Sequence, residues 1–294
     1  MRISTLPTLY GEKVVIRILK RNEETLNRRG IGIPAVEDAK IDTLLGLTSG
    51  VIMIVGPTGS GKSSTMYTLI RELLSDRTNL ITLEDPVEYH IKGATQVQIN
   101  EKVGLTFASG LRSVLRQDPD IIMVGETRDS ETASISVRAA ITGHLVFSTL
   151  HTNDSASSII RLVDMGLEPY MIANSLVGVV AQRLMRKVCP LCAVAEEPTE
   201  EEKEFMERAI PRIMRPRGCR HCNNTGYKGR TAIHEILTID RTIRDMISSH
   251  ATVEEIKDYA LEHQGMKTLK ECGVDLVEAG VTTMEELMKV AYYS

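Results

Sequence analysis

Short apolar segments alternate with longer amphipathic segments through the middle of the chain. The apolar segments have the length and β-branched composition of buried strands, and they are Val51–Val55, Leu80–Leu83, Val97–Ile99, Ile121–Val124 and Leu145–Thr149. Segments with helical spacing lie between and after them, at Lys62–Leu74, Phe107–Leu115, Glu131–Ile141, Ser155–Val163 and Tyr170–Arg183. Strands separated by helical patterns predict an α/β fold, with a mostly parallel sheet that helices cover on both faces.

The pattern changes at both ends of the chain. Residues 1–20 alternate as two adjacent strands would, with a turn at Gly11-Glu12, and a polar linker follows over Lys20–Arg29. The spacing over Ala35–Gly50 predicts an amphipathic helix ended by glycine, and residues 231–294 are expected to be helical. Capping boxes are predicted at three helix starts: Thr199-x-x-Glu202, Thr252-x-x-Glu255 and Thr283-x-x-Glu286.

Composition and charge narrow the class of protein. The chain has 294 residues, of which 42% are hydrophobic and 25% charged, which is ordinary for a soluble globular protein of about two domains. The formal charge of −4 argues against a protein that coats nucleic acid with its whole surface. The apolar runs are too short to span a bilayer and no export signal is visible, so we expect a cytoplasmic protein.

A phosphate-binding motif follows the first buried strand. Gly56-Pro57-Thr58-Gly59-Ser60-Gly61-Lys62-Ser63 fits G-x-x-x-x-G-K-[ST], and Ser64 opens the helix behind it. Glycines let the backbone N–H groups face an anion, Lys62 would reach the β- and γ-phosphates, and the Ser63 hydroxyl would bind Mg²⁺. The alternative is a glycine-rich turn without a phosphate.

Acidic residues follow two of the other strands. Ile121–Val124 should lie beside the phosphate-loop strand, and it is followed by Gly125-Glu126, without the usual Mg²⁺-holding aspartate. Glu126 is therefore the acid placed to orient a water. Glu84 and Asp85 follow Leu80–Leu83 and would point into the same cleft, unless Asp85 and the following proline form a plain turn. Two carboxylates near one Mg²⁺ suit hydrolysis by an activated water.

Two histidines flank the strand Leu145–Thr149. His144 and His151 should lie on opposite faces of that strand, so they are not expected to share a ligand. Either could contact a γ-phosphate, and either could equally be a packed or capping histidine.

Four cysteines form two pairs, Cys189-x-x-Cys192 and Cys219-x-x-Cys222. This pattern predicts a closed tetrahedral Zn²⁺ site, a structural staple, with His221 as an alternative ligand and with free thiols or a disulfide as alternatives to a metal. The segment between the pairs contains an acidic run, Glu196–Glu204, and then five arginines: Arg208, Arg212, Arg215, Arg217 and Arg220. Cys272 lies in a helical segment and is expected to be a buried free thiol.

Four ordered boxes resemble one family over essentially the whole chain. Besides the phosphate loop with Ser64-Thr65, they are Leu83-Glu84-Asp85-Pro86-Val87-Glu88, the stretch from Arg116-Gln117-Asp118-Pro119-Asp120 to Gly125-Glu126-Thr127-Arg128-Asp129, and Thr142-Gly143-His144 through His151-Thr152-Asn153. The chain resembles the motor ATPases of type II secretion and type IV pilus assembly.

The resemblance implies a RecA-like P-loop NTPase core that works in a hexameric ring, with ATP between the core and a preceding domain. It makes Glu126 the main catalytic carboxylate, lets Glu84 assist, and puts His151 and His144 near the phosphates. It also places four arginines against the phosphates: Arg2, Arg17, Arg112 and Arg116. From the residues alone, Arg2 and Arg17 could be ordinary exposed strand residues.

The resemblance also divides the chain into parts. Residues 1–33 match the last strands and linker of a preceding domain, 34–186 the ATPase core, 187–230 a tetracysteine zinc subdomain and 231–294 a C-terminal helical subdomain. Because family members carry a whole domain before the core, we expect weak ATPase activity and poor hexamer formation compared with a version extended at its N-terminus.

The predicted function is that of a cytoplasmic motor ATPase, using ATP and Mg²⁺, that drives assembly of a type IV pilus or a type II secretion pseudopilus. The resemblance implies a homo-hexamer when full length, recruited to the inner membrane by platform and recruiting proteins, and no nucleic acid. The tetracysteine insert favours assembly or secretion over pilus retraction. The alternatives are a retraction ATPase, a nucleic-acid-associated ATPase that grips a backbone with its zinc module and Arg208–Arg220, and an ATP-binding module that does not hydrolyse.

Overall fold

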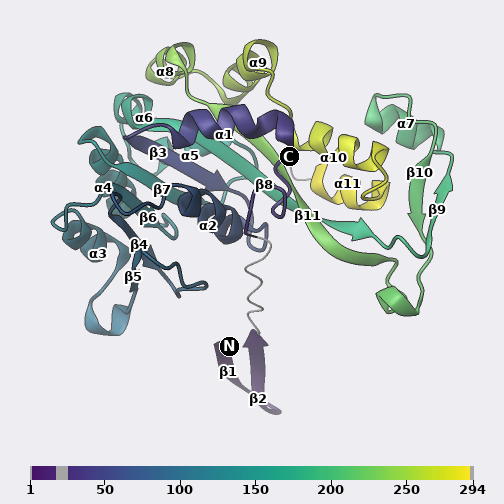
Figure 1. The fold of residues 1–294 in the computed structure, drawn as a ribbon, viewed down its shortest axis with the longest axis horizontal. Coiled ribbons are helices and arrows are strands. Elements are labelled where there is room, and N and C mark those ends of the chain that lie inside the picture. The colour runs from purple at the N-terminus through teal and green to yellow at the C-terminus, as the bar shows by residue number, and fades with distance from the viewer. Residues whose placement is uncertain (1, 18–25, 292–294) are drawn as a thin grey trace.

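The computed structural model describes residues 2–17 and 26–291. Its centre is a seven-stranded sheet in the order β11-β8-β3-β7-β6-β4-β5 (Figure 1). The strands are β3 (Gly50–Val55), β4 (Leu80–Glu84), β5 (Thr95–Gln98), β6 (Ile121–Val124), β7 (Leu145–Leu150), β8 (Leu176–Val188) and β11 (Tyr227–Thr238). Every neighbouring pair is parallel except β11 with β8. The predicted α/β fold with a mostly parallel sheet is confirmed.

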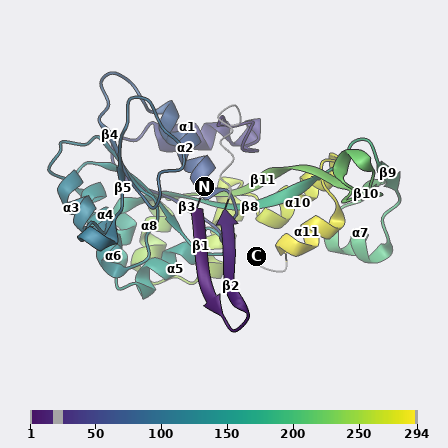
Figure 2. The same ribbon diagram turned by 90° about the horizontal axis from the view of Figure 1, so that it is seen from below.

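Helices bury both faces of this sheet. Along β3, Val51, Met53 and Val55 face one core, while Ile52 and Ile54 face the other. The second face is covered by α1 (Asp38–Leu45) and α2 (Lys62–Glu72), and the first by α3 (Phe107–Val114), α4 (Ser130–Ile141), α5 (Ser157–Asp164), α6 (Pro169–Ser175), α8 (Arg241–Ser248) and α9 (Val253–Gln264), as Figure 2 shows. Because helices exclude water from both faces, the strands are continuously apolar. Each fully buried apolar side chain contributes roughly 2 kcal/mol to the stability of the fold.

One predicted helix is largely wrong. The segment Tyr170–Arg183 was expected to be helical, but α6 ends at Ser175 and β8 begins at Leu176. Short apolar runs do not distinguish a buried strand from a buried helix. Pairing decides here, because β8 is held between β3 and β11, and a Cβ at Gly178 would lie 2.5 Å from the Leu44 side chain.

Two further segments differ in extent from the prediction. The helix expected over Ala35–Gly50 is a 3-10 turn at Ala35–Glu37 followed by α1, which ends at Leu45. The C-terminal segment is helical only after Thr238, where β11 ends. No helix in the ranges 2–17 and 26–291 is long and apolar enough to cross a bilayer.

The two longest strands connect the sheet to a second group of elements. We call β8 and β11 together the β8–β11 ribbon; it continues past the sheet and reaches the paired cysteines (Figure 1). The elements around its far part are β9 (Ala193–Glu196), α7 (Glu200–Met206), β10 (Ile213–Pro216), α10 (Leu269–Glu278) and α11 (Met284–Ala291). Residues of α7, β10, α10 and α11 share a third core with the ribbon, in which Met185 and Ile233 pack with Leu269 and Leu287.

The N-terminal residues form a hairpin, as predicted. Strand β1 (Arg2–Thr8) pairs antiparallel with β2 (Gly11–Arg17), and Arg2 lies opposite Arg17 in the register. Apolar side chains of both strands are exposed, Ile3 at 55% and Ile16 at 54%. The predicted linker Lys20–Arg29 falls mostly outside the described residues.

The predicted caps hold at two of three helix starts. Thr199 with Glu202 and Thr252 with Glu255 form full capping boxes. Thr283 accepts a bond from the Glu286 backbone at 3.4 Å, but the Glu286 carboxylate binds Arg186 instead, accepting from its backbone N–H at 3.0 Å and from its guanidinium at 2.7 Å. The third box is replaced by an ion pair that fastens α11 to β8.

The Glu286–Arg186 pair predicts a pH-dependent stability. Burial alone would raise the pKa of Glu286, but Arg186 outweighs it and lowers this pKa to about 2. Because the folded pKa is depressed, the stabilisation is complete above the unfolded pKa of about 4.3 and is lost as pH falls towards 2. We expect Glu286→Gln to lower the free energy of unfolding by about 2 kcal/mol at pH 7, and by less than half of that at pH 3. Denaturant unfolding at both pH values measures the difference.

The matched control is Glu285→Gln, because Glu285 lies on the same helix turn but its side chain is 60% exposed. That variant should change the stability little at either pH. A loss for Glu286→Gln that is the same at pH 3 as at pH 7 would contradict the assigned pKa.

Candidate functional site

The glycine-rich loop lies between the carboxyl end of β3 and the start of α2. Gly56, Gly59 and Gly61 have φ values of 149°, 83° and 91°, which residues other than glycine rarely adopt. Helix α2 has no side-chain cap and no acidic residue in its first turn. Backbone N–H groups at an uncapped helix start form a site for an anion.

The ammonium group of Lys62 is held by carbonyl groups of the same loop. Lys62 Nζ donates to the carbonyl oxygens of Gly56 at 2.7 Å and Pro57 at 3.1 Å. Burial lowers the pKa of Lys62 to about 8, against the opposing influence of the Glu126 charge. Ser60 Oγ is buried and has no hydrogen-bond partner among the described residues. A half-buried cation bonded only to carbonyls, an unused hydroxyl and an uncapped helix are the groups that a phosphate chain requires, so this loop fits a nucleotide.

The carboxylate of Glu126 follows β6, but β6 does not lie beside β3 as the sequence predicted. Strand β7 lies between them, pairing in parallel with both. The Glu126 side chain is 16% exposed and its Oε2 accepts from Arg128 Nε at 2.7 Å. Its charge affects Lys62 and His151, so the three side chains are close enough to interact electrostatically.

The two histidines are separated by the length of β7. His151 follows β7 at the carboxyl edge, where the Gly56 N–H donates to the Leu150 carbonyl oxygen. Burial first, and then the Lys62 charge, lower the pKa of His151, which favours the neutral ring at pH 7. His144 precedes β7 at the amino edge, with its Nδ1 2.9 Å from the Ala139 carbonyl oxygen. The structure therefore brings His151, and not His144, to the phosphate loop of the same chain.

Glu84 ends β4 at the carboxyl edge, but its carboxylate is already engaged. The side chain is 3% exposed and accepts hydrogen bonds from Tyr67 of α2, from Thr82 at 2.6 Å and from Gln96 at 3.0 Å. In this conformation Glu84 fastens α2 to β4. The peptide bond between Asp85 and Pro86 is cis.

Of the four predicted arginines, Arg112 and Arg116 lie away from the loop of this chain. Arg112 pairs with Glu131 of α4 beside a cavity of about 460 Å³. Arg116 is exposed in the turn before β6, where the next two carbonyls accept from Asn79 at the amino edge of the sheet. The side chains of Arg2 and Arg17 lie outside the described residues.

The ribbon contributes polar residues that belong to none of the sequence motifs. Arg183 of β8, 6% exposed, donates to Asn153 Oδ1 at 3.1 Å. Glu235 of β11, 1% exposed, accepts from the Ser155 backbone N–H at 2.9 Å and from its hydroxyl at 2.6 Å. These residues hold the loop that follows His151. The sequence signal for Arg183 was the polar pair Gln182-Arg183, which interrupts a run of apolar residues that begins at Leu176.

The four paired cysteines converge. Their sulfur atoms all lie within 4.8 Å of one another, with Sγ–Sγ distances of 3.9 Å for Cys189–Cys219 and for Cys192–Cys222. All four are free thiols, which agrees with the spacing, because a disulfide needs about 2.05 Å. The backbone N–H groups of Cys219 and Gly226 each lie 3.2 Å from the Cys222 sulfur. His221 is exposed and is not in the cluster, and Cys272 is a partly buried free thiol.

Three arginines of the segment between the cysteine pairs are held in ion pairs. Arg215 makes two bonds of 2.6 Å to Glu202, and Arg217 pairs with Glu196. Arg208 reaches α10, where it pairs with Asp275 at 2.7 Å and Glu278 at 2.8 Å. A strip of free arginines for a nucleic-acid backbone is therefore not formed by these three residues.

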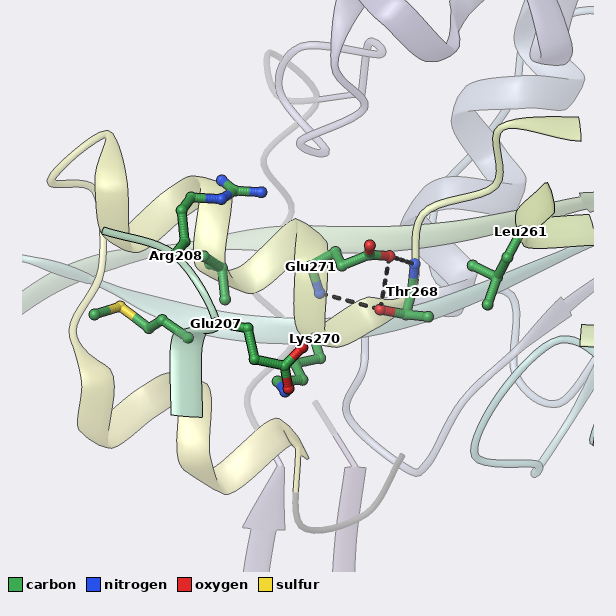
Figure 3. Close-up of a pocket in the computed structure, with 8 residues that line it drawn as sticks. Glu207, Arg208, Leu261, Thr268, Lys270 and Glu271 are labelled. Atoms are coloured by element: carbon green, nitrogen blue, oxygen red, sulfur yellow. Dashed lines mark hydrogen bonds and ion pairs between the residues drawn. The ribbon is translucent and has the colours of Figure 1, made fainter. Parts of the chain in front are cut away.

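A second hollow lies between the end of α7 and the start of α10 (Figure 3). It has a volume of about 230 Å³ and is lined by Met206, Glu207, Arg208, Leu261, Thr268, Lys270, Glu271 and Val274. Its polar groups already have internal partners, since Lys270 pairs with Glu207 and Thr268 forms a capping box with Glu271. We regard it as a seam between packed elements.

Comparison with known proteins identifies the family of the chain. The model of the family described as "Type II/IV secretion system protein" matches residues 1–289. The chain belongs to the type II/IV secretion system protein family. In sequence this family member is similar to a type II secretion system protein E from Aeromonas hydrophila, with 44% identity over 99% of the chain and 58% of that protein. It is also similar to the type IV pilus assembly ATPase PilB from Thermus thermophilus, with 46% identity over 98% of the chain and 33% of that protein.

A solved structure shares the fold of this type II/IV secretion system family member. It is that of the pilus retraction motor PilT with bound ADP, with a TM-score of 0.70, 28% identity, and coverage of 97% of this chain and 72% of the other. The chain spans a little over half the length of its type II secretion relatives.

The lowered pKa of Lys62 predicts unusual reactivity. A neutral amine is the nucleophile, so an amine-selective acylating reagent should label Lys62 half-maximally near pH 8, while exposed lysines need a pH near 10. Labelling measured by peptide mass spectrometry across a pH series gives the profile. ATP with Mg²⁺ should protect Lys62 from labelling and leave the labelling of the exposed lysines unchanged. Half-labelling of Lys62 above pH 10 would contradict the prediction.

Proposed function

We propose that this chain is the ATP-hydrolysing part of a motor that drives assembly of a type IV pilus or a type II secretion pseudopilus. The observation that carries the proposal is one site at the carboxyl edge of a parallel sheet, where an uncapped helix start, Lys62, His151 and Glu126 lie close enough to interact. The names of the similar proteins supply the cargo class. The preferred fold is a RecA-like core, with the predicted domain divisions at 33, 186 and 230.

The chain's own residues divide the work of hydrolysis. The loop N–H groups and Lys62 bind the phosphates, and Ser63 is the residue placed to hold Mg²⁺, which neutralises charge that develops on the phosphates. Glu126 orients the attacking water once it releases Arg128. His151, held neutral, donates a hydrogen bond near the γ-phosphate. Glu84 supports the site through α2 and assists only after leaving Tyr67.

The remaining groups belong to the assembled motor. We assign Arg2, Arg17, Arg112 and Arg116 to contacts with phosphates across a homo-hexameric ring, because the family resemblance places all four against phosphates and Arg112 and Arg116 lie away from the loop of their own chain. Peripheral recruitment to the inner membrane, by platform and recruiting proteins, follows from the proposed cargo.

We also propose that the four cysteines bind one structural Zn²⁺. Tetrahedral thiolates at about 2.3 Å from Zn²⁺ are about 3.8 Å apart, which matches the sulfur separations in the cluster. Two backbone N–H groups aimed at Cys222 stabilise a thiolate there. The closed ligand set leaves no open position for catalysis, so the metal would fasten β9 and β10 to the end of the ribbon.

Assembly or secretion is preferred to the alternatives. The sequence relatives with 44% and 46% identity have secretion and pilus assembly names, while the retraction motor PilT is 28% identical. The paired arginines of the insert disfavour a nucleic-acid role, and the placement of Glu126 by the loop disfavours a module that only binds ATP.

Replacing Glu126 tests the hydrolysis proposal. Glu126→Gln keeps the shape but cannot accept a proton, so we expect ATP turnover to fall about a hundredfold or more while ATP affinity changes less than about threefold. Phosphate release and equilibrium nucleotide binding measure the two effects. The matched control is Glu254→Gln, an exposed carboxylate on α9 away from the loop, which should leave both unchanged. Unchanged turnover in Glu126→Gln would support a non-hydrolysing module instead.

Metal content tests the zinc proposal. Native mass spectrometry should find one zinc per chain, and Cys219→Ser should lose it and lower the melting temperature by about 5 °C or more. Cys272→Ser is the control, because Cys272 is a free thiol outside the cluster, and that variant should keep its zinc. A metal-free wild-type chain would overturn the assignment.

A further inference from the structure

One buried amide connects the phosphate loop to the ribbon. Gln182 lies in the middle of β8 and is 1% exposed. Its Nε2 donates to the Ser60 carbonyl oxygen at 2.8 Å, and its Oε1 accepts from the Thr65 hydroxyl at 2.6 Å. One side chain thus holds both the loop and the first turns of α2.

The orientation of this amide is fixed by chemistry. A carbonyl oxygen can only accept, so the Ser60 oxygen requires the NH₂ group, and the Thr65 hydroxyl is then left to donate to Oε1. Across the strand pair lies His234, which is buried. The bonds found for the Gln182 amide go to Ser60 and Thr65, and not to His234.

Close packing on Gln182 also explains two loop glycines. A Cβ at Gly61 would lie 2.8 Å from the side-chain Nε2 of Gln182, and a Cβ at Gly56 would lie 2.5 Å from the backbone carbonyl oxygen of Gln182. Both glycines also have left-handed φ values. The loop rests against Gln182 at its first and last glycine, with no space for movement on that side.

We propose that Gln182 is a positioning residue, which holds the phosphate loop in the curvature that binds ATP. It touches no phosphate; it acts through its hydrogen bond to the Ser60 carbonyl oxygen. The inference rests on the proposed nucleotide function of the loop. It predicts that the amide donor matters more than the bulk of the side chain.

The test compares variants that remove one bond at a time. Gln182→Glu keeps the acceptor for Thr65 but sets a carboxylate against the Ser60 carbonyl, and Gln182→Met keeps the length but neither bond. Thr65→Val is the matched control, because it removes the other hydrogen bond and leaves the Ser60 contact. All are measured in the full chain.

Loss of the loop contact should appear in nucleotide binding. We expect Gln182→Glu and Gln182→Met to weaken binding of a fluorescent ATP analogue with Mg²⁺ by about tenfold, and to raise KM more than they lower kcat, whereas Thr65→Val changes binding less than about threefold. Without nucleotide, hydrogen exchange of amides 56–63 should be faster in Gln182→Met and unchanged in Thr65→Val.

Two outcomes separate this inference from the function on which it rests. Lys62→Ala must lose nucleotide binding; if it binds like the wild type, the proposed phosphate site is wrong. If Lys62→Ala loses binding while both Gln182 variants bind like the wild type, with a lowered melting temperature and unchanged loop exchange, Gln182 is only a packing residue and the inference is overturned. Gln182→Met decides the result if Gln182→Glu does not fold.

Discussion

Parallel pairing of β3 with β7 on one side and with β8 on the other is the constraint on which the rest of the structure depends. In parallel strands the carboxyl ends lie at one edge, so the loops after Val55 and Leu150 meet there. The same pairing sets the polar residues of β8 beside the phosphate loop. A shift of β3 by one residue would exchange the two buried faces and remove Gly56 from its place against β8.

Local chemistry made much of this architecture predictable from the sequence. Four strands of the sheet and the helix after the phosphate loop are close to their predicted ranges. Strands buried on both faces are continuously apolar, and the spacing of the loop glycines is typical of a phosphate-binding loop that precedes a helix. The cysteine pairs were also identified, and the structure brings their sulfur atoms together. Their spacing needs no knowledge of long-range packing.

The errors arose where tertiary contacts decide. The segment after Ser175 becomes a strand because β3 and β11 are available to pair with it. The position of β7 between β3 and β6 is a property of the sheet order, which no local pattern encodes. Likewise, the engagement of Glu84 by Tyr67 and Gln96 depends on residues from two other elements.

The segment between Val188 and Tyr227, which we call the cysteine module, is joined to the rest of the chain through one strand pair. Val188 and Tyr227 face each other in the register of β8 and β11, so the whole module replaces what would otherwise be a hairpin turn. Such an insertion changes neither the order of the strands nor the loops at the carboxyl edge of the sheet. The module can therefore be exchanged or lost in evolution while the strand order and the site at the carboxyl edge of the sheet stay the same.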